Sequence, residues 1–328
     1  MFSSSFTGKF SAVAKQINII RNFSAFRCRF VSKGVYYSSK MRFVQYKRKD
    51  NDQCRYVGIS SDDGTSIKEL RSLPCYPNDL KELIASGVDI EKLKCEIDDF
   101  DCIATSDVEL LSPILEPQKI LCVGLNYKGH CDEQKKEYPK EPMFFSKYAS
   151  TLVGPTGNVI AHKISDQIDW EVELAVIIGK KASHVKKENA FDYVFGYAVA
   201  QDISARDWQK QRNGGQFLIG KSMDSFCPLG PAVVHKSALD PRDLTIKCSV
   251  NDVLKQCGKT SELIFTIDDV IERITQSITL LPGDIILTGT PGGVGMHRCP
   301  PEFLKVGDVI ESEIEGIGKI INTVVAGQ

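Results

Sequence analysis

Short apolar runs, bounded by Gly, Pro or Asp, recur from residue 119 to the end of the chain and predict a strand-rich domain. One helix interrupts them, because Thr266 and Asp269 stand at capping-box spacing before apolar residues at helical spacing. The sequence therefore indicates an α+β class. The predicted strands are Ile120–Val123, Glu171–Ile178, Val194–Asp202, Ala232–Val234, Leu244–Val250, Ile285–Leu287 and Val309–Ile314.

The part before residue 115 follows a different pattern and predicts a small N-terminal domain over residues 41–114. Met41 to Val57 is typical of two strands joined by a polar turn, and Asp79 to Ser86 of a short helix. Pro113 and Pro117 mark the passage into the second domain, residues 115–328. Nothing in the N-terminal part indicates chemistry.

The first 40 residues are distinct in composition. No Asp or Glu occurs before Asp50, while Lys and Arg recur among Ser, Phe and Ile. This composition predicts a mitochondrial transit peptide over residues 1–40, and hence a location in the mitochondrial matrix. A disordered basic tail is the alternative; a secretory signal fits less well, because basic residues interrupt every apolar stretch.

The net charge limits the classes of binding partner, and the cysteine content indicates the cellular compartment. A formal net charge of -1 favours neither nucleic acid nor an anionic membrane, and no apolar run is long enough for a membrane span. The 11 cysteines are scattered without CxxC spacing, so the sequence lacks the signature of a zinc ribbon or a thioredoxin-like site. We expect reduced, buried thiols, as in the cytosol or the mitochondrial matrix.

Glu171 and Glu173 form the first candidate metal site. In a strand they project to one face, while Val172 and the following alternate residues form an apolar face. Two such carboxylates about 4 Å apart would repel by roughly 4 kcal/mol at an effective dielectric near 20. A hard divalent ion, Mg²⁺ or Mn²⁺, would neutralise them. The alternative is an exposed acidic edge strand.

Asp202 adds a third carboxylate at the end of the next predicted strand, on the same face as the small residues Ala198 and Ala200. These small side chains leave room for a cation and a ligand. Arg206 follows closely and could clamp a substrate carboxylate through two hydrogen bonds. An intrachain salt bridge explains Arg206 equally well.

His130 and Glu133 are three residues apart, so one helical turn would bring the imidazole and the carboxylate together as a general base. A surface helix pair is the alternative. Lys221 ends an apolar run. The Gly-rich loop Leu287–Gly295 lacks the Gly-Lys-Ser/Thr ending of a P-loop, which excludes a nucleotide site of that kind, but its amides and the Thr290 hydroxyl could bind a carboxylate.

In this order, five motifs over residues 115–328 resemble the fumarylacetoacetate hydrolase superfamily. Two further motifs, Lys140–Lys147 and Asp169-Trp170, together with the N-terminal domain, are similar to its mitochondrial "domain-containing protein 2" branch. The five motifs are Val123-Gly-Leu-Asn-Tyr-x-x-His130, Glu171-Val-Glu173, Gln201–Asp207, Gly220-Lys221 and Thr288-Gly-Thr-Pro291.

The resemblance implies a mixed β-sandwich roll, a Mg²⁺ or Mn²⁺ site and a homodimer. It implies a base dyad on a mobile lid, an active-site lysine, three metal ligands and three substrate-binding residues. The dyad is His130 and Glu133, and the active-site lysine is Lys221. The metal ligands are Glu171, Glu173 and Asp202, and the substrate-binding residues are Arg206, Gln209 and Thr290.

One departure bears on the reaction. Fumarylacetoacetate hydrolase has a fourth carboxylate ligand shortly before the lid histidine, and Leu121–Asn126 contains none. We therefore expect a different activity on a small keto acid, and the branch implies interconversion of enol and keto oxaloacetate. Acylpyruvate hydrolysis and oxaloacetate decarboxylation could use the same residues. A metal-binding mitochondrial protein without turnover is the non-enzyme alternative.

Overall fold

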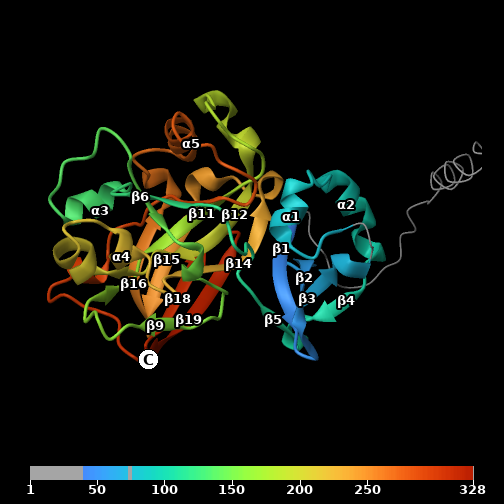
Figure 1. The fold of residues 1–328 in the computed structure, drawn as a ribbon, viewed down its shortest axis with the longest axis horizontal. Coiled ribbons are helices and arrows are strands. Elements are labelled where there is room, and N and C mark those ends of the chain that lie inside the picture. Colours follow the sequence, from blue (N-terminus) through green and yellow to red (C-terminus); the bar gives the residue numbers. More distant parts are fainter. Residues whose placement is uncertain (1–39, 73–75, 328) are drawn as a thin grey trace, which may run out of the picture. The chain divides into compact units, whose positions relative to one another are not determined.

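The computed structural model describes residues 40–72 and 76–327, and these form a strand-rich α+β structure with mixed sheets, as the sequence predicts (Figure 1). The predicted transit peptide lies outside the described residues, apart from Lys40. Within the described ranges, no helix is both long and apolar enough to cross a membrane.

Twelve strands form the larger sheet, with the order β4-β3-β2-β1-β14-β12-β11-β17-β6-β7; β5 pairs with β1, and β8 with β14. The N-terminal strands therefore continue the sheet that carries the predicted catalytic strands, through the pairing of β1 with β14. The boundary at residue 114 stays a prediction. The strands are β1 (Arg42–Arg48), β2 (Asn51–Ser60), β3 (Ser66–Glu69), β4 (Cys102–Ala104), β5 (Val108–Leu110), β6 (Ile120–Gly124), β7 (Met143–Lys147), β8 (Leu152–Val153), β11 (Val172–Ile178), β12 (Val194–Gln201), β14 (Cys227–His235) and β17 (Ile285–Leu287).

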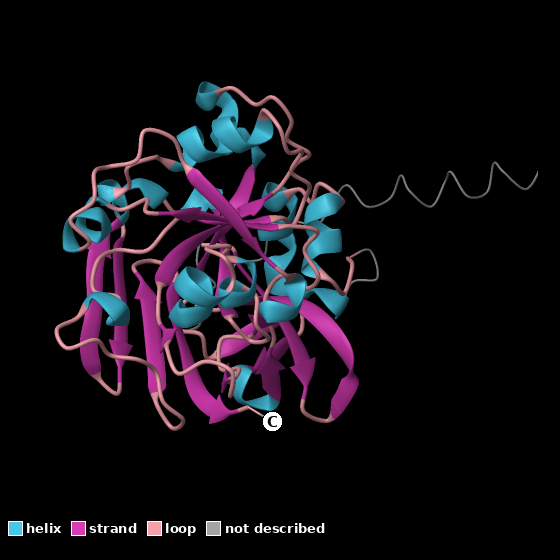
Figure 2. Cartoon of the chain, turned by 60° about the vertical axis from the view of Figure 1, so that its left-hand side comes forward, coloured by secondary structure: helices cyan, strands magenta, loops and turns pink. Residues whose placement is uncertain are grey.

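A second sheet of five strands has the order β16-β15-β18-β19-β9, and β10 pairs separately with β13. Both larger sheets are mixed, because β6 runs parallel to β17 and β9 runs parallel to β19. In the turned view the strands fan out through the lower half of the drawing, and short helices lie mainly in its upper half and centre (Figure 2). The remaining strands are β9 (Val159–Ala161), β10 (Ile168–Asp169), β13 (Ser204–Ala205), β15 (Thr245–Val250), β16 (Val253–Lys259), β18 (Val309–Ile314) and β19 (Gly318–Ala326).

Strand β11 is buried on both faces. Its Val172 and Leu174 pack into a large apolar core shared with the five-stranded sheet, as the predicted alternation requires. Its other face carries Ala175 and Ile177 into a second core, shared with the N-terminal strands and helices. Both glutamates of the candidate metal site thus lie at the start of a central strand, where the surrounding cores fix the backbone.

The helices are short, and the sequence signals at their ends are confirmed where we had predicted them. Thr266 and Asp269 form the capping box of α5, whose apolar face is buried. Asp79 caps the N-terminus of α1 through two backbone amides. The helices are α1 (Leu80–Ala85), α2 (Ile90–Glu96), α3 (Lys128–Glu133), α4 (Leu218–Lys221) and α5 (Ile267–Thr275), with a π-helical turn, η7 (Trp208–Arg212).

The prediction of buried thiols is wrong for part of the chain, because several cysteines lie on edge strands or short helices with outward-facing positions. Among the described residues, the buried cysteines are Cys122, Cys131, Cys227 and Cys248, and the exposed cysteines are Cys54, Cys95, Cys102, Cys257 and Cys299.

Candidate active site

The three predicted metal ligands converge. Glu171 precedes β11, Glu173 lies within it, and Asp202 follows β12, its antiparallel neighbour. One oxygen from each carboxylate lies within 4.8 Å of the others. The residues are 5%, 2% and 0% exposed, and β11 lies between β12 and β17. An exposed acidic edge strand is therefore excluded.

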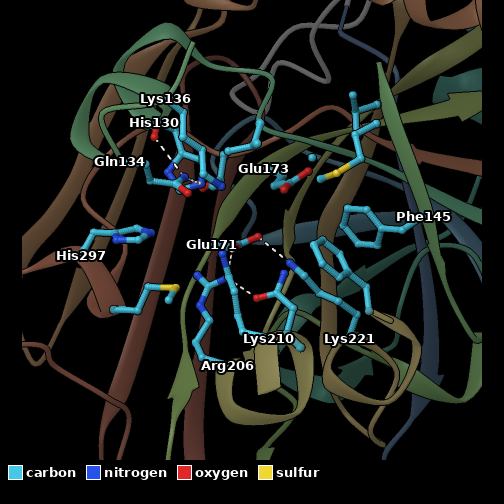
Figure 3. Close-up of a pocket in the computed structure, with 18 residues that line it drawn as sticks. His130, Gln134, Lys136, Phe145, Glu171, Glu173, Arg206, Lys210, Lys221 and His297 are labelled. Carbon is cyan, nitrogen blue, oxygen red and sulfur yellow. Dashed lines mark hydrogen bonds and ion pairs between the residues drawn. The ribbon is translucent and has the colours of Figure 1, made fainter. Parts of the chain in front are cut away.

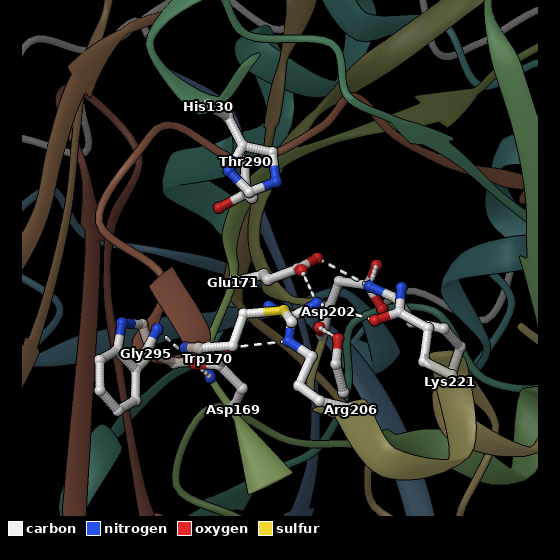
Figure 4. A network of polar contacts seen from close by, with 12 residues as sticks. His130, Asp169, Trp170, Glu171, Asp202, Arg206, Lys221, Thr290 and Gly295 are labelled. Carbon is white, nitrogen blue, oxygen red and sulfur yellow. Dashed lines mark hydrogen bonds and ion pairs between the residues drawn. The ribbon is translucent and has the colours of Figure 1, made fainter. Parts of the chain in front are cut away.

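Two buried lysines meet this carboxylate cluster. Lys221 Nζ donates to Glu171 Oε2 at 2.7 Å and to Asp202 Oδ2 at 2.6 Å (Figure 4). Lys147 Nζ, from β7, donates to Asp202 Oδ1 at 2.6 Å. Burial alone would lower the pKa of Lys221, but Asp202 and Glu171 raise it above its ordinary value. Lys221 is therefore a fixed positive charge at the floor of the site.

Glu173 lacks such a cation. It accepts a hydrogen bond from the Gly289 amide at 2.7 Å and makes no ion pair within the described part of the chain. Burial, followed by the charges of Asp202 and Glu171, raises the pKa of Glu173 well above its ordinary range. A buried carboxylate without a cation is costly, so this donor set fits a hard divalent ion held by all three carboxylates.

Arg206 forms the intrachain salt bridges that we gave as an alternative, and one of its nitrogens has no partner within the described part of the chain. Its Nε donates to Asp169 Oδ2 at 2.8 Å, and its Nη1 lies 2.6 Å from Glu171 Oε1. Nη1 also donates to Gln209 Oε1 at 3.0 Å. Nη2 is buried without a hydrogen-bond partner, although Arg206 lines the pocket. One nitrogen of this buried guanidinium thus lacks an acceptor among the described residues.

His130 and Glu133 form the predicted pair on α3. His130 Nδ1 lies 2.5 Å from Glu133 Oε1, and Gln134 Nε2 lies 3.0 Å from His130 Nε2. Because the Gln134 amide nitrogen can only donate, Nε2 accepts, and Nδ1 then carries the proton toward Glu133. His130 is 7% exposed, so the surface-pair alternative is wrong. The imidazole presents its basic nitrogen within the pocket.

The Gly-rich loop binds carboxylates that belong to the chain itself. Its Gly289, Gly293 and Gly295 amides each donate at 2.7 Å, to Glu173, Glu133 and Asp169 respectively. Gly289 and Gly293 have φ values of 104° and 102°, which L side chains rarely adopt. The loop thus ties the metal cluster, the dyad and the Arg206 partner together.

Thr290 lies in the same loop, with its hydroxyl engaged. It donates to the Val172 carbonyl at 2.9 Å and accepts from Gln256 Nε2 at 2.8 Å. Its predicted contact with substrate stays a prediction.

These groups surround a cavity of about 110 Å³ (Figure 3). This is small beside the roughly 300–1,000 Å³ of sites for drug-sized ligands, and suits a small acid. Seven of the nine predicted residues line it, with Asp202 and Glu133 behind them. Sequence reasoning assigned no role to Asp169 and Lys147, although both lie in motifs that carry the resemblance. It also missed four lining residues with no sequence signal: Gln134, Lys136, Lys210 and His297.

Comparison with known proteins agrees with this geometry. A family model described as "Fumarylacetoacetate (FAA) hydrolase C-terminal" matches residues 119–325. The chain belongs to the fumarylacetoacetate hydrolase family. Within the family, it is 44% identical over 295 residues to "Oxaloacetate tautomerase FAHD2A, mitochondrial" of Homo sapiens, covering 88% of this chain and 93% of that protein. A Xenopus laevis relative, "Oxaloacetate tautomerase fahd2, mitochondrial", is 44% identical over 290 residues, 87% and 90% of the two chains.

A solved structure also shares the family fold. The fumarylacetoacetate hydrolase of Exiguobacterium antarcticum superposes with a TM-score of 0.79 at 35% identity, covering 88% of this chain and all of that one. The likeness therefore reaches beyond the family model into the N-terminal strands.

Proposed function

We propose that this member of the fumarylacetoacetate hydrolase family is an isomerase that interconverts the enol and keto forms of oxaloacetate. The observation that carries the proposal is one small cavity lined both by His130, whose basic Nε2 is hydrogen-bonded to Gln134, and by the Lys221–Glu171 pair. Tautomerisation needs a positioned base and stabilisation of enolate charge, and both are present. The names of the relatives at 44% identity support the same reaction.

The residues take the following roles. When bound to Glu171, Glu173 and Asp202, a divalent ion would act as a Lewis acid toward the substrate's keto acid group. Lys221 places positive charge beside the C2 oxygen. Arg206 Nη2, with Gln209, binds the distal carboxylate, and Thr290 contacts the substrate from the loop.

His130 then moves the proton at C3. Its Nε2 accepts that proton, while Glu133 stabilises the imidazolium that results. Gln134 must first release Nε2. No Ser or Cys is among the residues that line the cavity, and the Thr290 hydroxyl is engaged. A covalent mechanism through a serine or cysteine nucleophile therefore has no candidate among the residues that line the cavity.

Two other reactions use the same groups. If His130 activated water, the protein would be an acylpyruvate hydrolase, which the likeness to a bacterial fumarylacetoacetate hydrolase favours. If the enolate formed by loss of CO₂, it would be an oxaloacetate decarboxylase. A metal-binding protein without turnover is the non-enzyme alternative. Enol absorbance, pyruvate and CO₂, followed together in one sample given enol-oxaloacetate and in a second given an acylpyruvate, separate all four.

The ion is Mg²⁺ or Mn²⁺ under this proposal, because the three ligands are hard carboxylate oxygens. Removing metal with EDTA is expected to abolish activity, and Mg²⁺ or Mn²⁺ to restore it. Full activity in a chelated sample would contradict the metal assignment.

Location and assembly complete the proposal. We place the protein in the mitochondrial matrix as a homodimer, since the relatives are named mitochondrial and residues 1–40 have transit-peptide composition. Deleting residues 1–40 is expected to leave the protein in the cytosol. Light scattering after size exclusion tests the dimer, and a mass of 36.4 kDa would refute it.

A further inference from the structure

Two lysines at the mouth of the cavity have no acidic partner. Lys136 follows α3, and Lys210 lies in η7; both are exposed and both line the cavity. Neither side chain makes a hydrogen bond or ion pair within the part of the chain that the structure describes. Figure 3 shows both in the pocket that contains Glu171. Lys147 and Lys221, by contrast, are held by carboxylates.

The two lysines repel each other and the cations below them. The pKa of Lys210 is lowered by burial first, then by the charges of Lys136, Arg206 and Lys221. Unpaired cations that converge on one cavity are unfavourable alone and become favourable when an anion lies between them. The repulsion between these cations is relieved when a negatively charged group of a ligand binds between them.

A second, independent observation points to the same ligand. Arg206 is 3% exposed, lines the cavity, and has its Nη2 buried without a partner. A buried guanidinium nitrogen of this kind calls for an acceptor. The other two Arg206 nitrogens are held by Asp169, Glu171 and Gln209, which fixes the direction of the guanidinium.

His297 adds a polar group on another side of the same cavity. Its ring lies 6.1 Å from that of His130, centroid to centroid. Burial lowers the pKa of His297, so at neutral pH it is a neutral hydrogen-bond donor rather than a third cation. The mouth therefore offers two charges and one neutral donor from three separate segments.

We propose that Lys136 and Lys210, together with Arg206 of the same cavity, form an anion subsite that selects dianionic keto acids by their distal carboxylate. The proposed function is needed only to identify the substrate as oxaloacetate; the binding of an anion at the subsite does not depend on it. Its chemistry is general: the floor of the cavity receives the α-oxygenated acid group, and the mouth receives the second carboxylate. Monocarboxylic keto acids would lack this second interaction.

Binding of two non-reactive acids tests the subsite without turnover. Lactate and malate share an α-hydroxy acid group, and malate adds a distal carboxylate. When each acid is titrated into the Mg²⁺-loaded full chain in a calorimeter, we expect malate to bind more tightly than lactate. In a Lys136→Gln, Lys210→Gln double variant, malate should bind roughly three- to thirtyfold more weakly, as for two partly exposed ion pairs, with lactate unchanged.

Two variants serve as controls. Lys181→Gln removes an exposed lysine that does not line the cavity and should leave both affinities unchanged. Lys210→Arg retains the charge and should retain malate affinity. Equal weakening of lactate and malate in the double variant, or no change in either, would overturn the subsite, as would equal affinity of the wild type for both acids.

The test also separates the subsite from the proposed reaction. If the wild type fails to turn over enol-oxaloacetate while malate affinity still depends on the two lysines, the subsite holds and the tautomerase proposal fails. If turnover is fast and malate affinity is indifferent to the lysines, the reverse conclusion follows.

Discussion

Glu133 Oε2 accepts a 2.7 Å hydrogen bond from the Gly293 amide, while Glu133 Oε1 lies 2.5 Å from His130 Nδ1. One carboxylate therefore joins helix α3 to the Gly-rich loop and orients the imidazole. This double role predicts different results for two substitutions at the same position.

Glu133→Gln keeps an oxygen for the Gly293 amide but loses the charge that stabilises the imidazolium, so kcat should fall with little change in KM. Glu133→Ala also loses the link to the loop, and both kcat and KM should change.

His130→Ala should reduce kcat by about 10²–10⁴-fold and leave metal binding intact. Steady-state kinetics with metal titration checks all three; a His130→Ala enzyme of wild-type rate would remove the base assignment.

Glu173 is the carboxylate of the cluster without a cation, and its raised pKa means that its ionised form is disfavoured in the metal-free protein. Glu173→Gln should raise the melting temperature of metal-free protein and eliminate the stabilisation by Mg²⁺. At 100 times Kd, that stabilisation is about 2.7 kcal/mol. Thermal unfolding with and without Mg²⁺ measures both effects. The exposed Glu188→Gln should alter neither, and an undiminished Mg²⁺ effect in Glu173→Gln would exclude Glu173 as a ligand.

Asp169 is fully buried and accepts from the Gly295 and Met296 amides and from Arg206 Nε. Asp169→Asn would leave the guanidinium with one carboxylate partner fewer, and breaking a buried pair costs about 3–5 kcal/mol. We expect a less stable protein with a raised KM and a smaller change in kcat. Urea unfolding measures the stability, and steady-state kinetics measures KM and kcat. An unchanged KM would show that substrate binding by Arg206 does not depend on Asp169.

The lowered pKa of Lys210 predicts how malate binding depends on pH. A lysine carries its charge only below its pKa, so Lys210 should become neutral below the ordinary lysine value of 10.5, and malate affinity should fall as pH rises through that lowered pKa. In Lys210→Arg the charge persists and the fall should be smaller. Identical profiles would contradict this assignment. The charged and titratable groups that face Lys210 are Lys136, Glu171, Arg206, Lys221 and His297.

The carboxylate cluster could be predicted because β11 and β12 are apolar, fully buried strands, and successive side chains of a strand point to opposite faces, which puts Glu171 and Glu173 on one face. Lys147 and Asp169 received no role, since their partners Asp202 and Arg206 lie 55 and 37 residues away and depend on how distant elements meet. Strand β16 was missed because Gln256 is its one buried residue, which leaves no apolar pattern.

The same limit applies to the mouth of the cavity. Lys136 and Lys210 come from segments 74 residues apart, and each by itself resembles an ordinary surface lysine. Lys210 follows Arg206 by four residues, but only the fold brings Lys136 to the same cavity. Residues in repeating elements could therefore be predicted, and those that act through loop-to-loop proximity could not.

The most direct test of the central proposal follows one purified, Mg²⁺-loaded sample supplied with enol-oxaloacetate. Enol absorbance, pyruvate and CO₂ are recorded together against a His130→Ala control. Tautomerisation breaks no carbon–carbon bond, so the enol signal should decay far faster than pyruvate or CO₂ appears, and the acceleration should be lost in the control. Pyruvate formed as fast as the enol signal decays would contradict the tautomerase and indicate carbon–carbon bond cleavage instead.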